Sequence, residues 1–100
     1  MLTKEQTITV LNQNKAFLST NYGVKRIGLF GSYAKGQPGD RSDVDIFVEF
    51  ERPIGLRFIE FVEYLEEIVG RKVDVLTPAG IQGIRIGRIA RDISESILYV

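Results

Sequence analysis

The stretch that decides the fold is Gly31-Ser32-Tyr33-Ala34-Lys35-Gly36-Gln37-Pro38-Gly39-Asp40-Arg41-Ser42-Asp43-Val44-Asp45. Apolar residues precede it at 27–30 and follow it at 46–48, and both segments have the composition of β-strands. The stretch between them predicts a turn, a short helix at 33–35 and a Gly-, Pro- and Asp-rich loop at 36–42. It therefore joins two predicted strands, with a Gly-Ser turn at one end and two carboxylates at the other.

The two carboxylates open the second predicted strand, over 42–50. Residues i and i+2 of a strand point to the same face, so Asp43 and Asp45 project side by side with Cα atoms roughly 6–7 Å apart. Two like charges this close are unfavourable unless a cation lies between them. Magnesium takes oxygen ligands and typically combines one or two carboxylates with substrate phosphates. The pair therefore predicts a magnesium site.

The Gly31-Ser32 turn predicts a phosphate site next to it. Glycine lets the backbone approach a ligand closely, and the N–H groups at the start of a helical turn attract anions. A P-loop is excluded, because Gln37-Pro38 follows Gly36 where Lys-Ser/Thr is required. A metal site and a phosphate site joined by one loop indicate chemistry on a nucleoside triphosphate.

A third carboxylate, Asp74, lies in the short apolar segment 73–76, which predicts a buried strand. A buried carboxylate without a partner is costly and stays neutral or binds a cation. Asp43 has a simpler alternative, since it could cap the strand entry or pair with Arg41. Acidic residues on two apolar strands together with a Gly-Ser turn nevertheless favour one shared metal centre, with two magnesium ions as in other phosphoryl-transfer sites.

The chain resembles the DNA polymerase beta-type nucleotidyltransferase superfamily in its sequence signature. This signature consists of Gly31-Ser32, ten intervening residues, Asp43-Val44-Asp45 and a later strand at 72–76. Within this superfamily, the short chain is similar to the minimal nucleotidyltransferases, the antitoxin partners of HEPN-domain toxins. The resemblance implies an α+β fold, with a small mixed sheet of three to four strands and helices packed on it, in one domain over residues 1–100. It implies these site residues: Asp43, Asp45 and Asp74 as catalytic and metal-binding residues, and Gly31, Ser32 and Lys35 as nucleotide-binding residues. Many relatives have arginine where Lys35 stands, so its planar fork is absent here.

The resemblance further implies transfer of AMP from ATP to a protein acceptor, a HEPN-type toxin that is also the complex partner. One alternative is a non-catalytic antitoxin that binds and masks its toxin. Nucleotidyl transfer to an RNA end or to a small molecule is a third possibility, which the neutral charge and the lack of an accessory domain disfavour.

Composition excludes several other classes. The chain has 13 basic and 13 acidic residues, which gives no general field for direct nucleic-acid binding. It has no Cys and no His, which excludes disulfides, thiolate or imidazole zinc sites and Ser-His-Asp catalysis. Neither a signal peptide nor a membrane-spanning run is visible, so we expect a cytoplasmic protein without a membrane partner.

Helices flank the predicted strands. A capping box at Thr3 and Gln6 predicts a helix to about Asn21, and an apolar stripe predicts another over 56–69. The stretch 81–97 is either a packed helix or a segment ordered by a partner, and 98–100 is a candidate edge strand. Arginine occurs there at every third position, as Arg85, Arg88 and Arg91. These side chains either lie on a solvated face or contact a phosphate or a partner.

Overall fold

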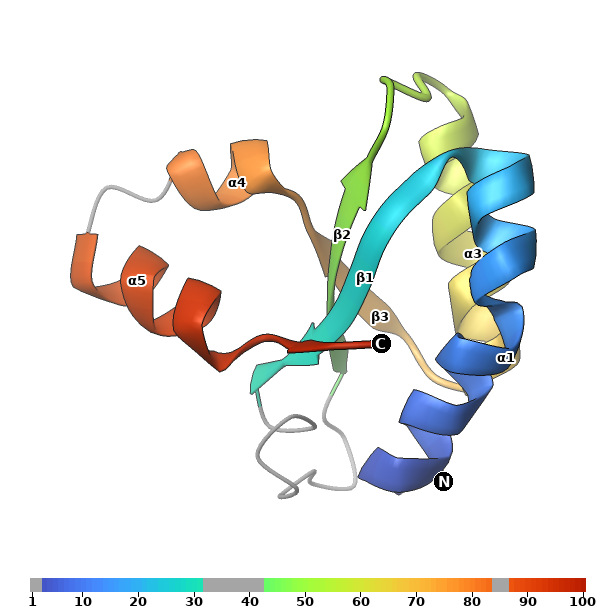
Figure 1. The fold of residues 1–100 in the computed structure, drawn as a ribbon, viewed down its shortest axis with the longest axis horizontal. Coiled ribbons are helices and arrows are strands. Elements are labelled where there is room, and N and C mark those ends of the chain that lie inside the picture. The colour runs from blue at the N-terminus through green and yellow to red at the C-terminus, as the bar shows by residue number, and fades with distance from the viewer. Residues whose placement is uncertain (1–2, 32–42, 84–86) are drawn as a thin grey trace.

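The computed structural model describes residues 3–31, 43–83 and 87–100. The elements follow one another along the chain as α1 (Lys4–Tyr22), β1 (Val24–Phe30), β2 (Val44–Phe50), α3 (Arg57–Val69), β3 (Val73–Leu76), α4 (Pro78–Gln82), α5 (Gly87–Ser96) and β4 (Leu98–Tyr99) (Figure 1). In this described part, no helix has both the length and the apolar character that a membrane span requires.

The four strands form one mixed sheet in the order β3-β2-β1-β4. β1 is antiparallel to both β2 and β4, whereas β2 and β3 run parallel. A parallel pair needs a crossover connection, which α3 provides. Helices α1 and α3 lie on one side of the sheet, and α4 and α5 lie on the other (Figure 1). This arrangement confirms the expected α+β fold with helices packed on a small mixed sheet.

The core lies between the sheet and the α1–α3 pair. On β2 the alternate residues Val44, Ile46 and Val48 are fully buried there. They pack in one cluster with Phe61 and Leu65, which form part of the apolar stripe of α3. Because strand side chains alternate between faces, the intervening residues of β2 must point to the opposite side, toward α4 and α5. The predicted alternation of β2 is therefore confirmed, and it directs the acidic residues away from the core.

Local signals set the helix ends as the sequence predicts. Thr3 and Gln6 form the complete capping box at the start of α1, with the Gln6 N–H donating to Thr3 Oγ1 at 3.1 Å. Gly23, with a φ of 70°, ends α1, and Gly70 ends α3 in the same left-handed conformation. The glycines therefore mark where each helix gives way to a strand.

The C-terminal stretch forms two short helices instead of one. Thr77 ends β3 and also caps α4, because its Oγ1 accepts a hydrogen bond from the Gly80 N–H at 3.2 Å. After α5 the predicted edge strand is confirmed as β4, which pairs with Gly28 and Leu29 of β1. The predicted helix at 33–35, the predicted loop at 36–42 and Arg85 lie outside the described residues.

Candidate active site

Two of the three predicted catalytic carboxylates are direct neighbours across the sheet. Asp45 of β2 pairs in register with Asp74 of β3. Paired residues of adjacent strands point to the same face, and such strands lie about 4.8 Å apart. The register therefore brings Asp45 and Asp74 together on the face that points away from α1 and α3.

Asp43 lies one residue before β2 and is exposed. The charge of Asp43 contributes to a raised pKa of the Asp45 carboxyl. Burial is the largest cause of this rise, followed by the charge of Asp74 and then by that of Asp43. Burial disfavours the charged form, and the two neighbouring carboxylates repel it. The negative charges of Asp74 and Asp43 thus both act on Asp45, and a bound cation would offset their repulsion.

Asp74 differs in one respect from the prediction, because its side chain is exposed and not buried. The apolar neighbours of Asp74 suggested a buried strand, but β3 lies at the edge of the sheet. Only Val73 of this strand belongs to the core. The cost of desolvation therefore falls on Asp45, which is half-buried, while Asp74 is accessible from solvent.

Gly31 closes the acidic site at the end of β1. Its φ is +70°, a conformation that favours glycine, and a Cβ at this position would collide with Asp45 Oδ2. The neighbouring Phe30 pairs with Asp45 across the two strands. A glycine is needed here, as expected, and the close approach that requires it is to the Asp45 carboxylate. The other two predicted nucleotide-binding residues, Ser32 and Lys35, lie outside the described residues.

The donor set fits magnesium when a substrate supplies further ligands. Among the residues described, no group of three acidic, His or Cys side chains is arranged to hold a metal ion by itself. Magnesium usually keeps several waters and takes one or two carboxylates plus substrate phosphates, so a complete protein cage is not required. Asp45 and Asp74 provide an adjacent carboxylate pair of this kind, and an all-oxygen set suits a hard cation.

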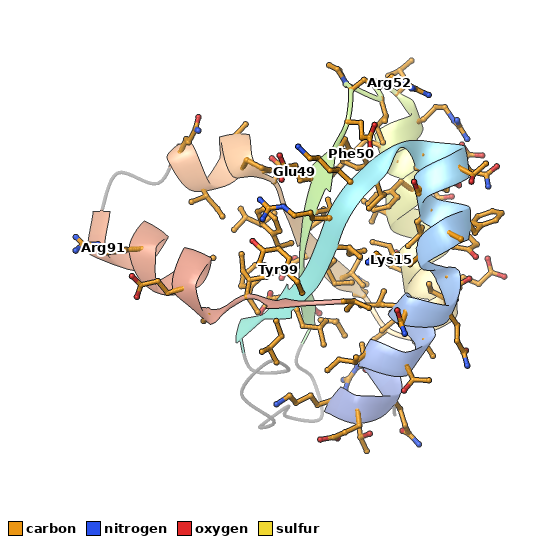
Figure 2. The ribbon with its side chains drawn as sticks, viewed as in Figure 1. Lys15, Glu49, Phe50, Arg52, Arg91 and Tyr99 are labelled. Carbon is orange, nitrogen blue, oxygen red and sulfur yellow. The ribbon has the colours of Figure 1, made fainter. Side chains whose placement is uncertain are left out.

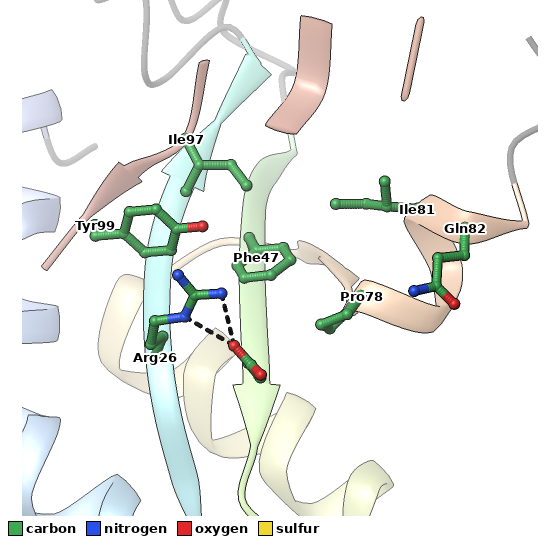
Figure 3. A pocket seen from close by; sticks show the side chains of 8 residues that line it. Arg26, Phe47, Pro78, Ile81, Gln82, Ile97 and Tyr99 are labelled. Carbon is green, nitrogen blue, oxygen red and sulfur yellow. Dashed lines mark hydrogen bonds and ion pairs between the residues drawn. The ribbon is translucent and has the colours of Figure 1, made fainter. Parts of the chain in front are cut away.

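A hollow of about 360 Å³ lies on the same side of the sheet. It is lined by residues from β1, β2, α4 and the end of the chain: Arg26, Phe47, Glu49, Pro78, Ile81, Gln82, Ile97 and Tyr99 (Figure 3). Arg26 donates from Nε to Glu49 Oε1 at 2.8 Å, and its Nη2 lies 2.7 Å from the same oxygen. The Arg26 guanidinium carbon lies 4.9 Å from the centre of the Tyr99 ring, and Tyr99 meets Phe47 edge to face at 5.9 Å.

Sequence reasoning did not find this hollow. The only sequence signal for it was the alternation of β2, which predicts that Phe47 and Glu49 lie on the same face as Asp45. Figure 2 shows Glu49 and Tyr99 on the side of the sheet that faces α4 and α5. The positions of Arg26 and Tyr99 depend on the register of β1 with β2 and β4, which no local pattern reveals.

Comparison with known proteins identifies the family. Residues 11–100 match the family model described as nucleotidyltransferase domain. The protein adenylyltransferase MntA of Thermococcus cleftensis is 40% identical over 101 residues, covering 100% of this chain and 98% of the relative. A relative in Methanocaldococcus jannaschii, named a candidate protein adenylyltransferase, is 39% identical over 103 residues and is matched over the full length of both chains.

Solved structures share the fold. A candidate minimal nucleotidyltransferase superposes with a TM-score of 0.68 at 25% identity, covering 92% of this chain and 93% of that chain. A toxin-antitoxin structure with AMP-PNP gives a TM-score of 0.62 at 20% identity, covering 98% of this chain and 72% of that chain, which shows a common fold. The expected enzyme class is confirmed: the chain belongs to the nucleotidyltransferase domain family.

Proposed function

We propose that this protein transfers AMP from ATP to a protein acceptor in a magnesium-dependent reaction. The observation that carries the proposal is the in-register pairing of Asp45 with Asp74, next to the close contact between Gly31 and Asp45. Carboxylates for a metal thus adjoin the turn predicted to bind phosphate. Support for ATP and for a protein acceptor comes from full-length relatives that are named protein adenylyltransferases.

Each site residue has a role in this proposal. Asp43 and Asp45 would hold two magnesium ions, with Asp74 as a further ligand or as the proton acceptor, and Gly31, Ser32 and Lys35 would bind the triphosphate. Magnesium, when bound, neutralises the phosphate charge and favours ionisation of the attacking hydroxyl. Asp74 is the group best placed to accept the hydroxyl proton, because it is exposed to an acceptor that approaches from solvent.

The acceptor hydroxyl, ATP and the residues named above account for every bond and proton in the reaction. An acceptor hydroxyl oxygen forms a bond to the α-phosphorus, and the bond from that phosphorus to the α–β bridging oxygen breaks. Pyrophosphate leaves with the bonding electrons, and the hydroxyl proton passes to Asp74 or to water. No histidine is needed for this proton transfer, in keeping with a chain that has none.

We propose further that the acceptor is a HEPN-type toxin and that the protein is its antitoxin. The MntA relative and the fold shared with a toxin-antitoxin complex support this partner. A second mode, neutralisation by binding alone, is favoured by exposed apolar side chains at the start of α3. Leu56 is 90% exposed and Ile59 is 63% exposed, which suits a protein contact.

Label transfer separates the two modes. With ATP labelled at the α-phosphate, we expect label on the toxin with the wild type and none with Asp43→Asn. Glu5→Gln is the matched control, because it removes one exposed acidic charge in the first turn of α1, on the side of the sheet away from Asp45 and away from the start of α3. Neutralisation of the toxin in cells by Asp43→Asn as complete as that by the wild type would contradict the enzymatic proposal and favour masking.

A further inference from the structure

We infer that the hollow beside the acidic site binds the nucleoside of ATP and selects adenine through Glu49 and Gln82. The inference rests on the proposed function, because it needs a triphosphate at Asp45. It adds a base-recognition site to the residues predicted from the sequence.

The position of the hollow follows from the strand register. Gly28 of β1 pairs with both Phe47 and Tyr99, while Phe30, two residues further on, pairs with Asp45. The row that contains the hollow therefore lies roughly 6–7 Å along the sheet from the acidic row and on the same face. A nucleoside is covalently joined to the α-phosphate, so it has to bind next to the metal-binding carboxylates. The hollow lies within this reach.

The lining has the character of a small-molecule site. Ligand pockets of roughly 300–1,000 Å³ are mainly apolar and carry a few placed polar groups, and a volume of about 360 Å³ falls in this range. The walls are Pro78 and Ile81 on one side and Ile97 on the other, with Phe47 between them (Figure 3). Bases stack on aromatic rings and on guanidinium planes. Arg26 lies over the Tyr99 ring, and the two side chains line the hollow together as one stacked pair.

Backbone packing keeps this wall close to the sheet. A Cβ at Gly28 would lie 2.8 Å from Ile97 Cγ2 and would also collide with the Leu98 carbonyl oxygen. The absence of a side chain at Gly28 therefore lets β4 bring Tyr99 beside Phe47. The Arg26–Glu49 pair holds the adjacent rim in a fixed geometry.

Two polar groups favour adenine. Glu49 uses Oε1 for Arg26, while Oε2 has a 3.9 Å ion pair with Lys25, which is longer than a hydrogen bond. Oε2 can therefore accept a hydrogen bond from the exocyclic amino group of adenine. Gln82, at the opposite rim, has an amide that both donates and accepts, the pattern by which glutamine pairs with adenine. Hypoxanthine has a carbonyl in place of this amino group and would face the Glu49 carboxylate.

Direct binding measurements test the inference. The probes are ATP and inorganic tripolyphosphate, each with magnesium, titrated into the full chain by calorimetry. We expect the wild type to bind ATP about 10-fold more tightly than tripolyphosphate, since stacking of one base is worth roughly that factor or more. Ile81→Trp, which fills the hollow, should reduce ATP affinity to the tripolyphosphate level. Ala79→Trp, at an exposed position of the same helix outside the hollow, is the matched control and should change neither affinity.

The other outcomes are distinct. Unchanged ATP affinity in Ile81→Trp, with a raised KM for the protein acceptor, would overturn the inference and assign the hollow to the acceptor. Failure of the wild type to bind either probe would overturn the proposed function as well. Gln82→Ala is a second test, because this side chain is exposed and its loss leaves α4 packed. It should reduce the preference for ATP over ITP about threefold or more, and an unchanged preference would contradict base selection by Gln82.

Discussion

At Asp45, burial and two neighbouring carboxylates all act in the same direction and raise the pKa. The folded-state pKa therefore lies above the unfolded-state value, and folding favours the protonated form. Protonated Asp45 therefore contributes its full stabilisation of the folded state at pH values below the unfolded-state pKa. This stabilisation is lost as the pH rises through the folded-state pKa. Above the folded-state pKa, the ionised Asp45 consequently destabilises the metal-free protein, and a bound cation would reverse this effect.

Replacing this carboxylate should therefore stabilise the metal-free protein. We expect Asp45→Asn to raise the free energy of unfolding at pH 7 by about 0.5–1 kcal/mol, the size of a cross-strand repulsion. Urea unfolding in EDTA measures the change, and the gain should shrink as the pH falls through the pKa of Asp45. Glu67→Gln, an exposed change on α3, should have little effect. A stability loss in Asp45→Asn would contradict the electrostatic description.

Gly31 and Gly70 form a natural control pair for the acidic site. Both have a positive φ, but a Cβ at Gly70 meets nothing within 4 Å, whereas at Gly31 it collides with Asp45. Each change to Ala should cost about 1–2 kcal/mol of backbone strain. Only Gly31→Ala should also weaken magnesium–ATP binding, because it displaces the Asp45 carboxylate. Calorimetry on both variants measures this, and equal affinities would show that Gly31 acts through the backbone alone.

Single residues also show where sequence reasoning succeeds. The alternation of Val44, Ile46 and Val48 in the sequence predicted that Asp45 lies on the opposite face, because strand geometry is local. The common face of Asp43 and Asp45 stays a prediction, since Asp43 precedes β2. The exposure of Asp74 could not be predicted, since an apolar tetrapeptide looks the same at the edge of a sheet and in its centre. Its exposure depends on the strand order, which places β3 at the edge.

Among the elements, α4 connects β3 to the hollow. Thr77 caps α4 and Thr3 caps α1 by equivalent hydrogen bonds from a backbone N–H. Loss of an N-cap threonine typically costs about 1 kcal/mol. We expect Thr3→Ala to lower the melting temperature without changing ATP affinity, whereas Thr77→Ala should weaken ATP binding. Melting curves and ATP titrations of the two variants measure this, and an ATP affinity unaltered by Thr77→Ala would separate α4 from binding.

Elements with strong periodicity were predictable, and those fixed by distant contacts were not. The apolar stripe of α3 and the glycine that follows it, Gly70, predicted both ends of this helix to within one residue. The division between α4 and α5 was not predicted, because the glycines at 80, 83 and 87 weaken a helix without showing where it breaks. β4 has only two residues and depends on β1 for its pairing, so local sequence suggested it without fixing its register.

For the whole molecule, substrate binding should appear as stability. A ligand that binds only the folded state at 100 times its Kd adds about 2.7 kcal/mol. For a domain of this size, that corresponds to a rise in Tm of roughly 10 °C or more. We expect this rise with magnesium and ATP in the wild type and a much smaller one in Asp74→Asn, as measured by differential scanning calorimetry. An equal rise in both proteins would exclude Asp74 from the metal site.

The two ends of α3 are attached to different elements. At its C-terminal end, Glu66 Oε2 accepts a hydrogen bond from the Val73 N–H at 3.1 Å, and the Lys72 carbonyl accepts one from the Val44 N–H at 3.0 Å. At its N-terminal end, Arg57 Nη1 donates to the Asn21 carbonyl at 2.7 Å, so the hydrogen bond there is to helix α1 and not to a strand. Homologous chains should consequently keep a constant length between 70 and 73. One residue inserted there would shift β3 by one position and turn Asp74 to the wrong face, leaving a folded protein that has lost its chemistry.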